Sequence, residues 1–231
     1  MDRSSKQPGI IKGVPNTNEI ITTNNWVMRI QRPVGKGPFP IVLMLHGWTG
    51  DENSMWIFSP RLLKNAILIA PRGLYKTKAS GYSWHAEITM PWPSFHDFIP
   101  SAEALMNTIF TINFPGGNFS QLHIVGFSQG AALGYTIAIM NPMKVTTLVG
   151  LSGFLPDGTT NLLRSEYLKG LPVFIAHGIE DDIVPVERAR MSVGVLQDAG
   201  AEVVYCEDQV GHKLSAKCFR GLEAFFQKVN C

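Results

Sequence analysis

The chain of 231 residues has few cysteines, no long apolar run and little net charge, and each shortage excludes a class of protein. Its three cysteines, Cys206, Cys218 and Cys231, are odd in number and lack the spacing of metal ligands. The sequence therefore predicts neither a disulfide framework nor a zinc site, and we expect three reduced thiols. No apolar stretch approaches the roughly 18 residues that a membrane-spanning helix needs, so no stable membrane insertion is expected.

The charge balance is close to neutral. The chain has 20 Lys and Arg against 18 Asp and Glu, which gives a net charge of +2. Without a dense basic run, these counts argue against a nucleic-acid surface and favour a small or neutral partner. The segment Met1–Gly13 is polar and lacks the apolar core of a signal peptide, which predicts a cytoplasmic protein. The sequence allows either a monomer or a homodimer.

Apolar runs of strand length alternate along the chain with longer stretches of helical character. This alternation predicts an α/β fold whose central sheet is mostly parallel and is flanked by helices on both faces. Residues 25–231 are expected to form a single domain, with residues 1–24 as an extension or an edge strand of the same domain. The predicted strands are Trp26–Gln31, Ile41–His46, Ala66–Ala70, Leu122–Gly126, Val145–Leu151, Val173–His177 and Glu202–Glu207. The predicted helices are Ser54–Leu63, Ser101–Ile112, Gln129–Met140, Val186–Asp198 and Ala216–Val229.

A Gly-x-Ser-x-Gly pentapeptide, Gly126 to Gly130, joins one predicted strand to a predicted helix. In a strand-to-helix turn this sharp, side chains two positions either side of the serine would collide, and glycine avoids the collision. The turn exposes the serine hydroxyl above the sheet and places it at a helix N-terminus, where developing negative charge is stabilised. An isolated pentapeptide of this kind also occurs in ordinary turns, but the flanking strand and helix favour Ser128 as a nucleophile.

A serine hydroxyl needs an imidazole to take its proton and a carboxylate to hold that imidazole. Downstream of the pentapeptide the sequence has two histidines, His177 and His212. His212 lies between the last strand and the last helix, where the base of such a fold belongs, whereas His177 is expected to pack or hydrogen-bond locally. The loop after His177 offers Glu180, Asp181 and Asp182, and spacing alone does not choose among them, since some of these acids could simply cap the following helix.

An oxyanion hole requires two backbone N–H groups, each worth a factor of about 10²–10³ in turnover. The N–H of Gln129, which follows the nucleophile, is expected to be one. The other is expected from the loop after an early strand, where His46-Gly47-Trp48 makes the N–H of Trp48 the candidate donor. The alternative for His46 and Trp48 is packing in the core.

The segment from Gly81 to Pro100 is rich in aromatic residues, among them Tyr82, Trp84 and Trp92. We expect it to form a short flap whose rings line an apolar acyl or aryl pocket beside the nucleophile. The alternative is that these rings cap the core. The stretch Ser152–Gly170 is too short for a lid domain, which favours an open site and small to medium esters.

Five segments together resemble the phospholipase/carboxylesterase family of α/β-hydrolases, which includes the acyl-protein thioesterases. They are Leu45-His46-Gly47-Trp48-Thr49-Gly50, Ala70-Pro71-Arg72-Gly73, the Gly126 pentapeptide, His177 to Pro185, and Gly211-His212. The resemblance implies an α/β-hydrolase fold with no large lid domain and no metal or cofactor. It also implies Asp181 as the triad acid, oxyanion donors at Trp48 and Gln129, and hydrolysis of carboxylic esters or thioesters.

The sequence departs from the thioesterase pattern at two places. It has Trp48-Thr49-Gly50-Asp51 where thioesterases carry leucine-glycine-aspartate after the histidine-glycine pair, and Tyr82-Ser83-Trp84-His85 where they carry tryptophan-phenylalanine-aspartate. The chain therefore resembles the broad esterases more than protein depalmitoylases. The expected function is a serine carboxylesterase that acts through an acyl-enzyme. The alternatives are a thioesterase or lysophospholipase on the same scaffold, and a binding module with a relic triad.

Overall fold

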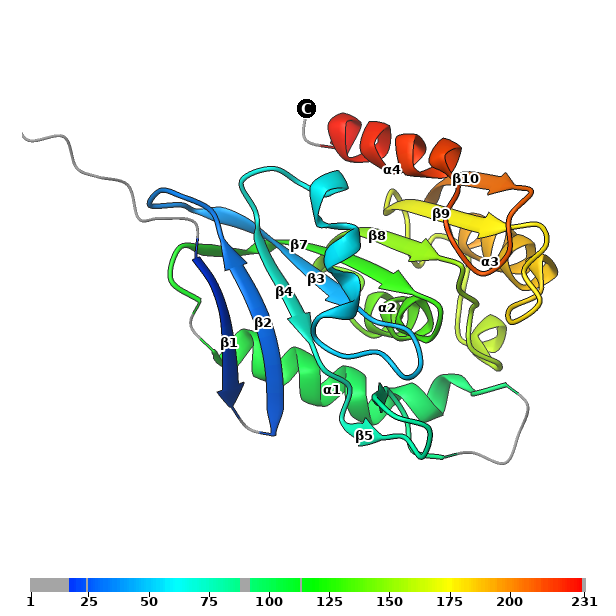
Figure 1. The fold of residues 1–231 in the computed structure, drawn as a ribbon. Coiled ribbons are helices and arrows are strands. Elements are labelled where there is room, and N and C mark those ends of the chain that lie inside the picture. Colours follow the sequence, from blue (N-terminus) through cyan, green and yellow to red (C-terminus); the bar gives the residue numbers. More distant parts are fainter. Residues whose placement is uncertain (1–16, 24, 88–91, 113, 230–231) are drawn as a thin grey trace, which may run out of the picture.

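An eight-stranded sheet forms the centre of the molecule in the computed structural model, which describes residues 17–23, 25–87, 92–112 and 114–229 (Figure 1). The strand order is β1-β2-β4-β3-β7-β8-β9-β10. The first two pairings, β1 with β2 and β2 with β4, are antiparallel, and every later pairing is parallel. The strands are β1 (Thr17–Thr23), β2 (Trp26–Arg32), β3 (Phe39–Leu45), β4 (Ile67–Pro71), β7 (Gly117–Phe127), β8 (Val145–Leu151), β9 (Pro172–Gly178) and β10 (Glu202–Asp208).

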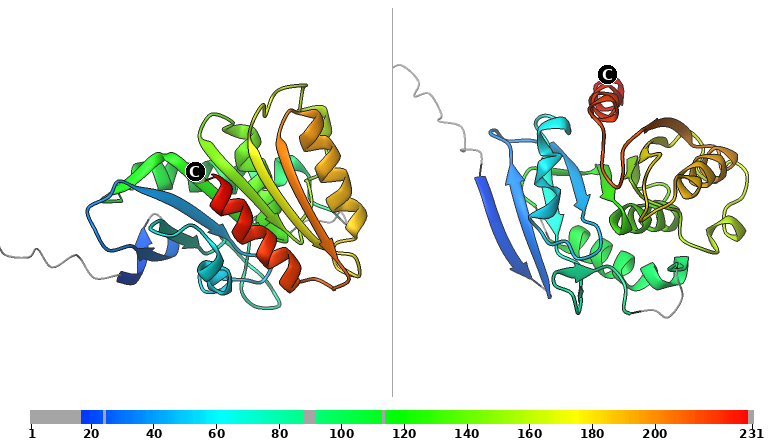
Figure 2. Two further views of the ribbon diagram at one scale, coloured as in Figure 1. Left: turned by 90° about the horizontal axis from the view of Figure 1, so that it is seen from above. Right: turned by 45° about the vertical axis from the view of Figure 1, so that its right-hand side comes forward.

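Helices cover both faces of this sheet, so the molecule has three layers (Figure 2). On one face the core includes residues of α1 (Phe95–Thr111), α2 (Gln129–Met140) and α3 (Val186–Asp198). On the other face α4 (Ala216–Val229) and two 3-10 helices pack against the strands. Strands covered on both sides must be apolar on both faces, and β4 is buried at every residue.

The predicted fold class is confirmed, and each of the seven predicted strands is present. The strand Val145–Leu151 has the predicted bounds, β7 begins five residues before the predicted Leu122, and the others differ by one or two residues at an end. Three predicted helices, α2, α3 and α4, have the predicted bounds. Residues 17–23 form the edge strand β1, whereas residues 1–16 and 24 lie outside the described part of the chain. The sequence analysis did not predict the small hairpin of β5 (Tyr75–Lys76) and β6 (Tyr82–Ser83).

Two helix predictions were wrong. The predicted helix Ser54–Leu63 is instead a pair of 3-10 helices, η1 (Ser54–Ile57) and η2 (Ser59–Arg61). Pro60 has no N–H to donate and its ring blocks a preceding turn, which prevents one continuous helix. The helix predicted to begin at Ser101 begins at Phe95, because Ser94 and Asp97 form a capping box in which the Ser94 N–H donates to Asp97 Oδ2 over 2.7 Å.

The segment between β8 and β9 contains only the 3-10 helix η3 (Thr159–Asn161) as regular secondary structure and carries no separate lid domain. In the part of the chain that the structure describes, none of the helices combines the length and the apolar character required to cross a bilayer.

Candidate active site

Ser128 lies at the junction of β7 and α2 in a conformation that L-residues rarely adopt. Its φ is 53° and its ψ is −118°. The turn is so tight that a Cβ on Gly126 would lie 2.3 Å from the carbonyl oxygen of Gly130, and a Cβ on Gly130 would lie 2.1 Å from that of Leu45. Only glycine fits at either position, as the sequence predicted. A strained serine at the N-terminus of a buried helix is therefore held in place by its surroundings.

The loop after β3 contacts this turn directly. A Cβ on Gly47 would lie 3.3 Å from the Cβ of Ser128 and 3.1 Å from Cδ1 of Phe127, so glycine lets the two backbones approach. The carbonyl of Gly47 accepts hydrogen bonds from His46 Nδ1 at 2.7 Å and from the N–H of Gly50 at 3.0 Å. Two donors thus fix the direction of the Gly47 carbonyl.

The protonation state of His46 follows from its partners. The N–H of Gly73 donates to Nε2 over 2.9 Å, so Nε2 is an acceptor and the proton is on Nδ1. Burial lowers the pKa of His46 to about 4, which keeps the ring neutral. Because the Gly47 carbonyl and the Trp48 N–H belong to one planar trans peptide unit, the bond from His46 also sets the direction of the Trp48 N–H.

Asp181 and His212 form a short hydrogen bond between two loops that follow β9 and β10. His212 Nδ1 lies 2.7 Å from Asp181 Oδ2, and the Asp181 side chain is fully buried. Glu180 and Asp182 are exposed. The sequence left three acids open, and the structure places Asp181 alone of the three against His212.

The other oxygen of Asp181 is held by backbone. Oδ1 accepts hydrogen bonds from the N–H groups of Ile183 at 3.0 Å and Val184 at 2.8 Å. His177 Nε2 donates to the Val184 carbonyl at 2.7 Å and lies 3.3 Å from Asp181 Oδ2. Burial lowers the pKa of His177, so its imidazole is neutral while it packs against Asp181. The predicted local role of His177 agrees with these contacts.

The ring of His212 faces the serine turn. Its centroid lies 5.0 Å from that of Phe127, the residue immediately before Ser128. Since Nδ1 is engaged by Asp181, Nε2 is the nitrogen that remains for a proton transfer. The sheet therefore brings Ser128, Asp181 and His212 to one edge from three separate strands.

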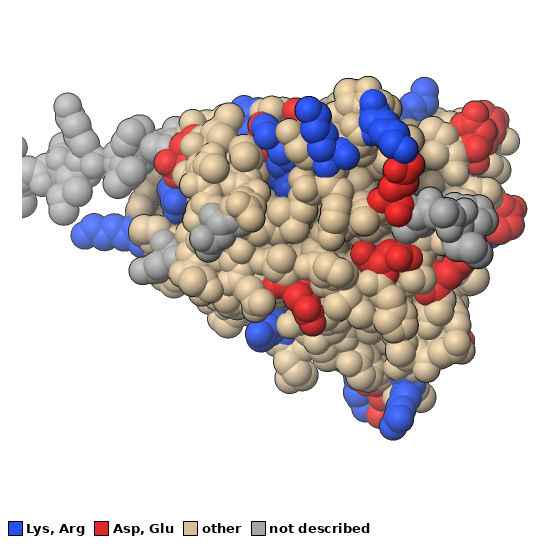
Figure 3. All heavy atoms as spheres, turned by 90° about the horizontal axis from the view of Figure 1, so that it is seen from below, with Lys and Arg blue, Asp and Glu red and all other residues tan. Residues whose placement is uncertain are grey.

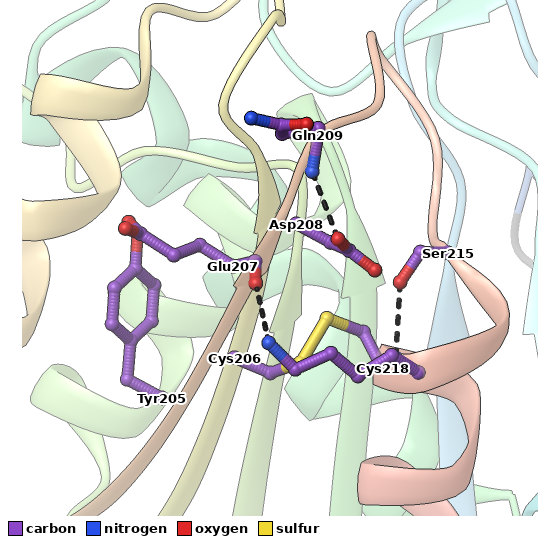
Figure 4. The surroundings of a disulfide bond; sticks show 8 residues. Tyr205, Cys206, Glu207, Asp208, Gln209, Ser215 and Cys218 are labelled. Atoms are coloured by element: carbon purple, nitrogen blue, oxygen red, sulfur yellow. Dashed lines mark hydrogen bonds between the residues drawn. A yellow bond between two sulfur atoms is a disulfide. The ribbon is translucent and has the colours of Figure 1, made fainter.

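The cysteine prediction was wrong. Cys206 on β10 and Cys218 on α4 form a disulfide that joins the two ends of the loop carrying His212 (Figure 4). Lys217 Nζ also donates to the carbonyl of Glu207, over 3.1 Å. The two cysteines lie on adjacent elements that the sequence does not show to be side by side. Their number and spacing therefore led to the wrong prediction of three reduced thiols. Cys231 lies outside the described residues.

A cavity of about 610 Å³ opens beside Ser128. Its apolar wall includes Trp48, Trp92, Phe154 and Ile183, and the rings of Trp92 and Phe154 meet at 5.0 Å. Trp92 therefore lies where the sequence predicted. Residues 88–91 of the predicted flap lie outside the described part of the chain.

Two predicted pocket residues lie elsewhere. Trp84 is fully buried, and its indole N–H donates to the carbonyl of His46 over 2.7 Å, so it supports the loop after β3 from within the core. Tyr82 packs its ring 4.7 Å from the guanidinium of Arg72, and its N–H donates to the Gly50 carbonyl. Arg72 Nη1 also donates to the half-buried Tyr82 hydroxyl over 3.2 Å, so polar partners hold both side chains, and neither lines the cavity.

A match to known proteins covers nearly the whole chain. A model of the phospholipase/carboxylesterase family matches residues 28–230. The chain belongs to this family.

Relatives in the phospholipase/carboxylesterase family agree with this assignment. Acyl-protein thioesterase 1 of Aspergillus fumigatus is 32% identical over 115 residues, which are 48% of this chain and 48% of the relative. The chain thus spans about half the length of that relative. The probable carboxylesterase SOBER1-like of Arabidopsis thaliana is 31% identical over 208 residues, which cover 81% of this chain and 78% of that protein.

The solved structures show the α/β-hydrolase fold. The crystal structure of the Bacillus cereus carboxylesterase matches with a TM-score of 0.77 and 19% identity, covering 90% of this chain and 100% of that one. At this identity the similarity concerns the fold alone. The loops that carry Ser128, Asp181 and His212 therefore follow strands of a sheet that this fold shares.

Sequence reasoning missed what the side chain of Gln129 does in this family member. Gln129 Oε1 accepts a hydrogen bond from the backbone N–H of Trp84 at 3.0 Å. Gln129 Nε2 donates to Ser83 Oγ at 3.0 Å and lies 2.8 Å from His85 Nε2. Gln129, the residue after Ser128, thus links the aromatic segment to the serine turn. Among the residues described, we find no group of three or more His, Cys, Asp or Glu side chains that could hold a metal ion.

Proposed function

We propose that this protein is a serine carboxylesterase in which Ser128 is the nucleophile, His212 the general base and Asp181 the acid that orients it. The observation that carries the proposal is the 2.7 Å bond between His212 Nδ1 and the buried Asp181, next to a serine strained into the nucleophile conformation. Asp181 holds the tautomer in which Nε2 is free to accept the serine proton. It also stabilises the imidazolium that forms.

The reaction proceeds by acylation and deacylation. As His212 takes the hydroxyl proton, Ser128 Oγ attacks the acyl carbon and the carbonyl electrons move to oxygen. The N–H groups of Trp48 and Gln129 donate to that oxyanion. When the intermediate collapses, the alcohol leaves with the proton from His212. A water molecule then repeats the sequence on the acyl-enzyme and releases the acid.

The acyl group occupies the cavity beside Ser128. Its walls of Trp92, Phe154 and Ile183 suit a small to medium apolar acyl or aryl group, and its volume of about 610 Å³ leaves room for one.

The face seen from below in Figure 3 carries acidic and basic side chains in scattered groups, separated by uncharged surface. This distribution supports a small-molecule ester as the partner.

Hydrolysis of 4-nitrophenyl esters of increasing acyl length tests the proposal, with fluorophosphonate labelling alongside. Ser128→Ala is expected to lose both activity and labelling. Ser120→Ala, an exposed serine on the same strand, is the matched control and should retain both. Equal activity in wild type and Ser128→Ala, or no activity and no labelling in either, contradicts the proposal and favours a binding module with a relic triad.

Thioester hydrolysis by the same site is the second candidate, because the Aspergillus fumigatus relative is an acyl-protein thioesterase. Matched oxygen and sulfur esters of one acyl group separate the two. A kcat/KM at least tenfold higher for the thioester makes this protein a thioesterase, and the reverse makes it an esterase.

A further inference from the structure

A second cavity, of about 590 Å³, also has Trp48 in its lining. Trp48 lines both cavities, whereas Ser128 lines only the first and His212 only the second. The candidate nucleophile and the candidate base therefore line different cavities, and Trp48 is common to both linings.

The reaction mechanism places the acyl group and the alcohol group of an ester in different cavities. In the collapse of the tetrahedral intermediate, the bond from the acyl carbon to the alcohol oxygen breaks, and its electron pair stays on that oxygen. The same oxygen takes the proton from His212 Nε2, so it must lie within hydrogen-bond distance of the imidazole. The substituent on this oxygen then projects to the side on which His212 lies.

We propose that the second cavity is a leaving-group site that binds the uncharged apolar part of the alcohol. This inference rests on the proposed function. It divides the substrate between two sites, with the acyl group held beside Ser128 and the alcohol group beside His212.

The lining of the second cavity fits such a group. Apolar side chains predominate: Met55, Ile57, Phe58, Phe127, Leu214 and Phe219. The ring of Phe58 lies 6.1 Å from that of Phe127 and 5.8 Å from that of Phe219, which makes a continuous aromatic wall. Apart from the imidazole, Lys213 is the single ionisable side chain of this lining over the described residues.

The mouth of the cavity is apolar as well. Ile57 is 71% exposed and Trp48 is 61% exposed, so large hydrophobic side chains face solvent at this site. Exposed apolar surface beside a reactive centre is typical of a ligand-binding surface. An alkyl or aryl alcohol that covers these side chains would gain about fourfold in binding for each buried methylene.

The chain offers a matched pair of residues for the test. Ile57 lines the second cavity, and Ile183, which is 60% exposed, lines the first. Because both side chains are exposed, Ile57→Gln and Ile183→Gln should fold. Met143, which is 95% exposed and lines neither cavity, provides the control Met143→Gln.

The experiment measures kcat/KM on two ester series. One series is acetates of ethanol, butanol and hexanol, whose alcohols have similar intrinsic reactivity. The other is ethyl esters of acetic, butanoic and hexanoic acids. Ile57→Gln is expected to lower the preference for hexyl over ethyl acetate about fivefold and to leave the acyl preference unchanged. Ile183→Gln is expected to do the reverse, and Met143→Gln to change neither preference.

Two outcomes would overturn the proposal. One is a change of acyl preference in Ile57→Gln, which would make the second cavity an acyl site. The other is an active wild-type enzyme whose alcohol preference is unaltered by Ile57→Gln. Failure of the proposed function itself is distinguishable, because Ser128→Ala would then hydrolyse these esters as fast as wild type, or wild type would hydrolyse none.

Discussion

His46 Nδ1 donates a 2.7 Å hydrogen bond to the carbonyl of Gly47, the neighbouring residue in the chain. Since that carbonyl shares a peptide unit with the N–H of Trp48, the ring is expected to orient the proposed oxyanion-hole donor without touching substrate. His46→Gln is therefore expected to lower kcat about tenfold to a hundredfold, with little change in KM, because the donor is used in the transition state.

Measuring kcat and KM separately on 4-nitrophenyl acetate checks this positioning role. His123→Gln, which replaces a buried histidine on β7, is the control for general loss of stability. An equal fall in apparent kcat in both variants, with KM unaltered, would show that His46 has only a structural role.

Asp181→Asn is expected to lower kcat by about 10³–10⁴, since an amide no longer holds His212 in the required tautomer. Asp182→Asn removes an exposed neighbouring carboxylate and should leave kcat within about twofold. Steady-state kinetics on one ester measures both. Equal losses in the two variants would reassign the acid.

Gly130→Ala should destabilise the protein by about 3 kcal/mol, because the new Cβ would lie 2.1 Å from the Leu45 carbonyl and would force β3 and α2 apart. Gly194→Ala on α3 is the matched control, with no atom within 4 Å of its new Cβ. It should stabilise by about 0.5–1 kcal/mol through helix propensity. Urea unfolding of both variants measures the difference.

Stability should fall as the pH drops from about 6.5 to about 4. Burial lowers the pKa of both His46 and His123 from 6.5 to about 4, so over this range the unfolded chain binds protons that the folded protein does not. Each histidine contributes a loss of about 3 kcal/mol, complete near pH 4 and absent above pH 7 or so. Urea unfolding at several pH values should show that the free energy of unfolding falls less with decreasing pH in His123→Gln than in wild type. An identical fall in the two proteins would contradict the role of His123.

Replacing both Cys206 and Cys218 by alanine should lower the free energy of unfolding by about 3 kcal/mol, the loop-closure value for cysteines 12 residues apart. Dithiothreitol should destabilise wild type but not the double variant. A thiol assay on the denatured, unreduced chain should find one free thiol, that of Cys231, and three after reduction. Because the cytoplasm expected from the sequence is reducing, the same assay on rapidly alkylated cells tests whether the bond forms there.

Features that depend on local sequence were predictable. The strands follow from apolar runs, and the turn at Ser128 follows from two glycines placed four residues apart. His212 could be assigned because loop order along the chain is itself a sequence property. The predicted helix Ser54–Leu63 failed because its residues have helical character but Pro60 breaks the hydrogen-bond ladder.

Features that depend on packing between distant segments were not predictable. An aromatic side chain such as Trp84 suits a pocket wall and a core equally. Its hydrogen bond to the His46 carbonyl, which comes from a distant segment, holds it in the core. The choice of Asp181 from the residues alone required knowing which carboxylate is buried beside His212. The role of His46 was hidden for the same reason, since the N–H of Gly73 that fixes its tautomer comes from another loop.

The Cys206–Cys218 disulfide also keeps the two parts of the chain linked after a protease cuts the loop between these cysteines. Lys213, an exposed residue between the two cysteines, offers trypsin a site in the loop that carries His212. A chain cut there keeps its C-terminal helix covalently attached. It would migrate as one species on a non-reducing gel and separate into two fragments once the disulfide is reduced.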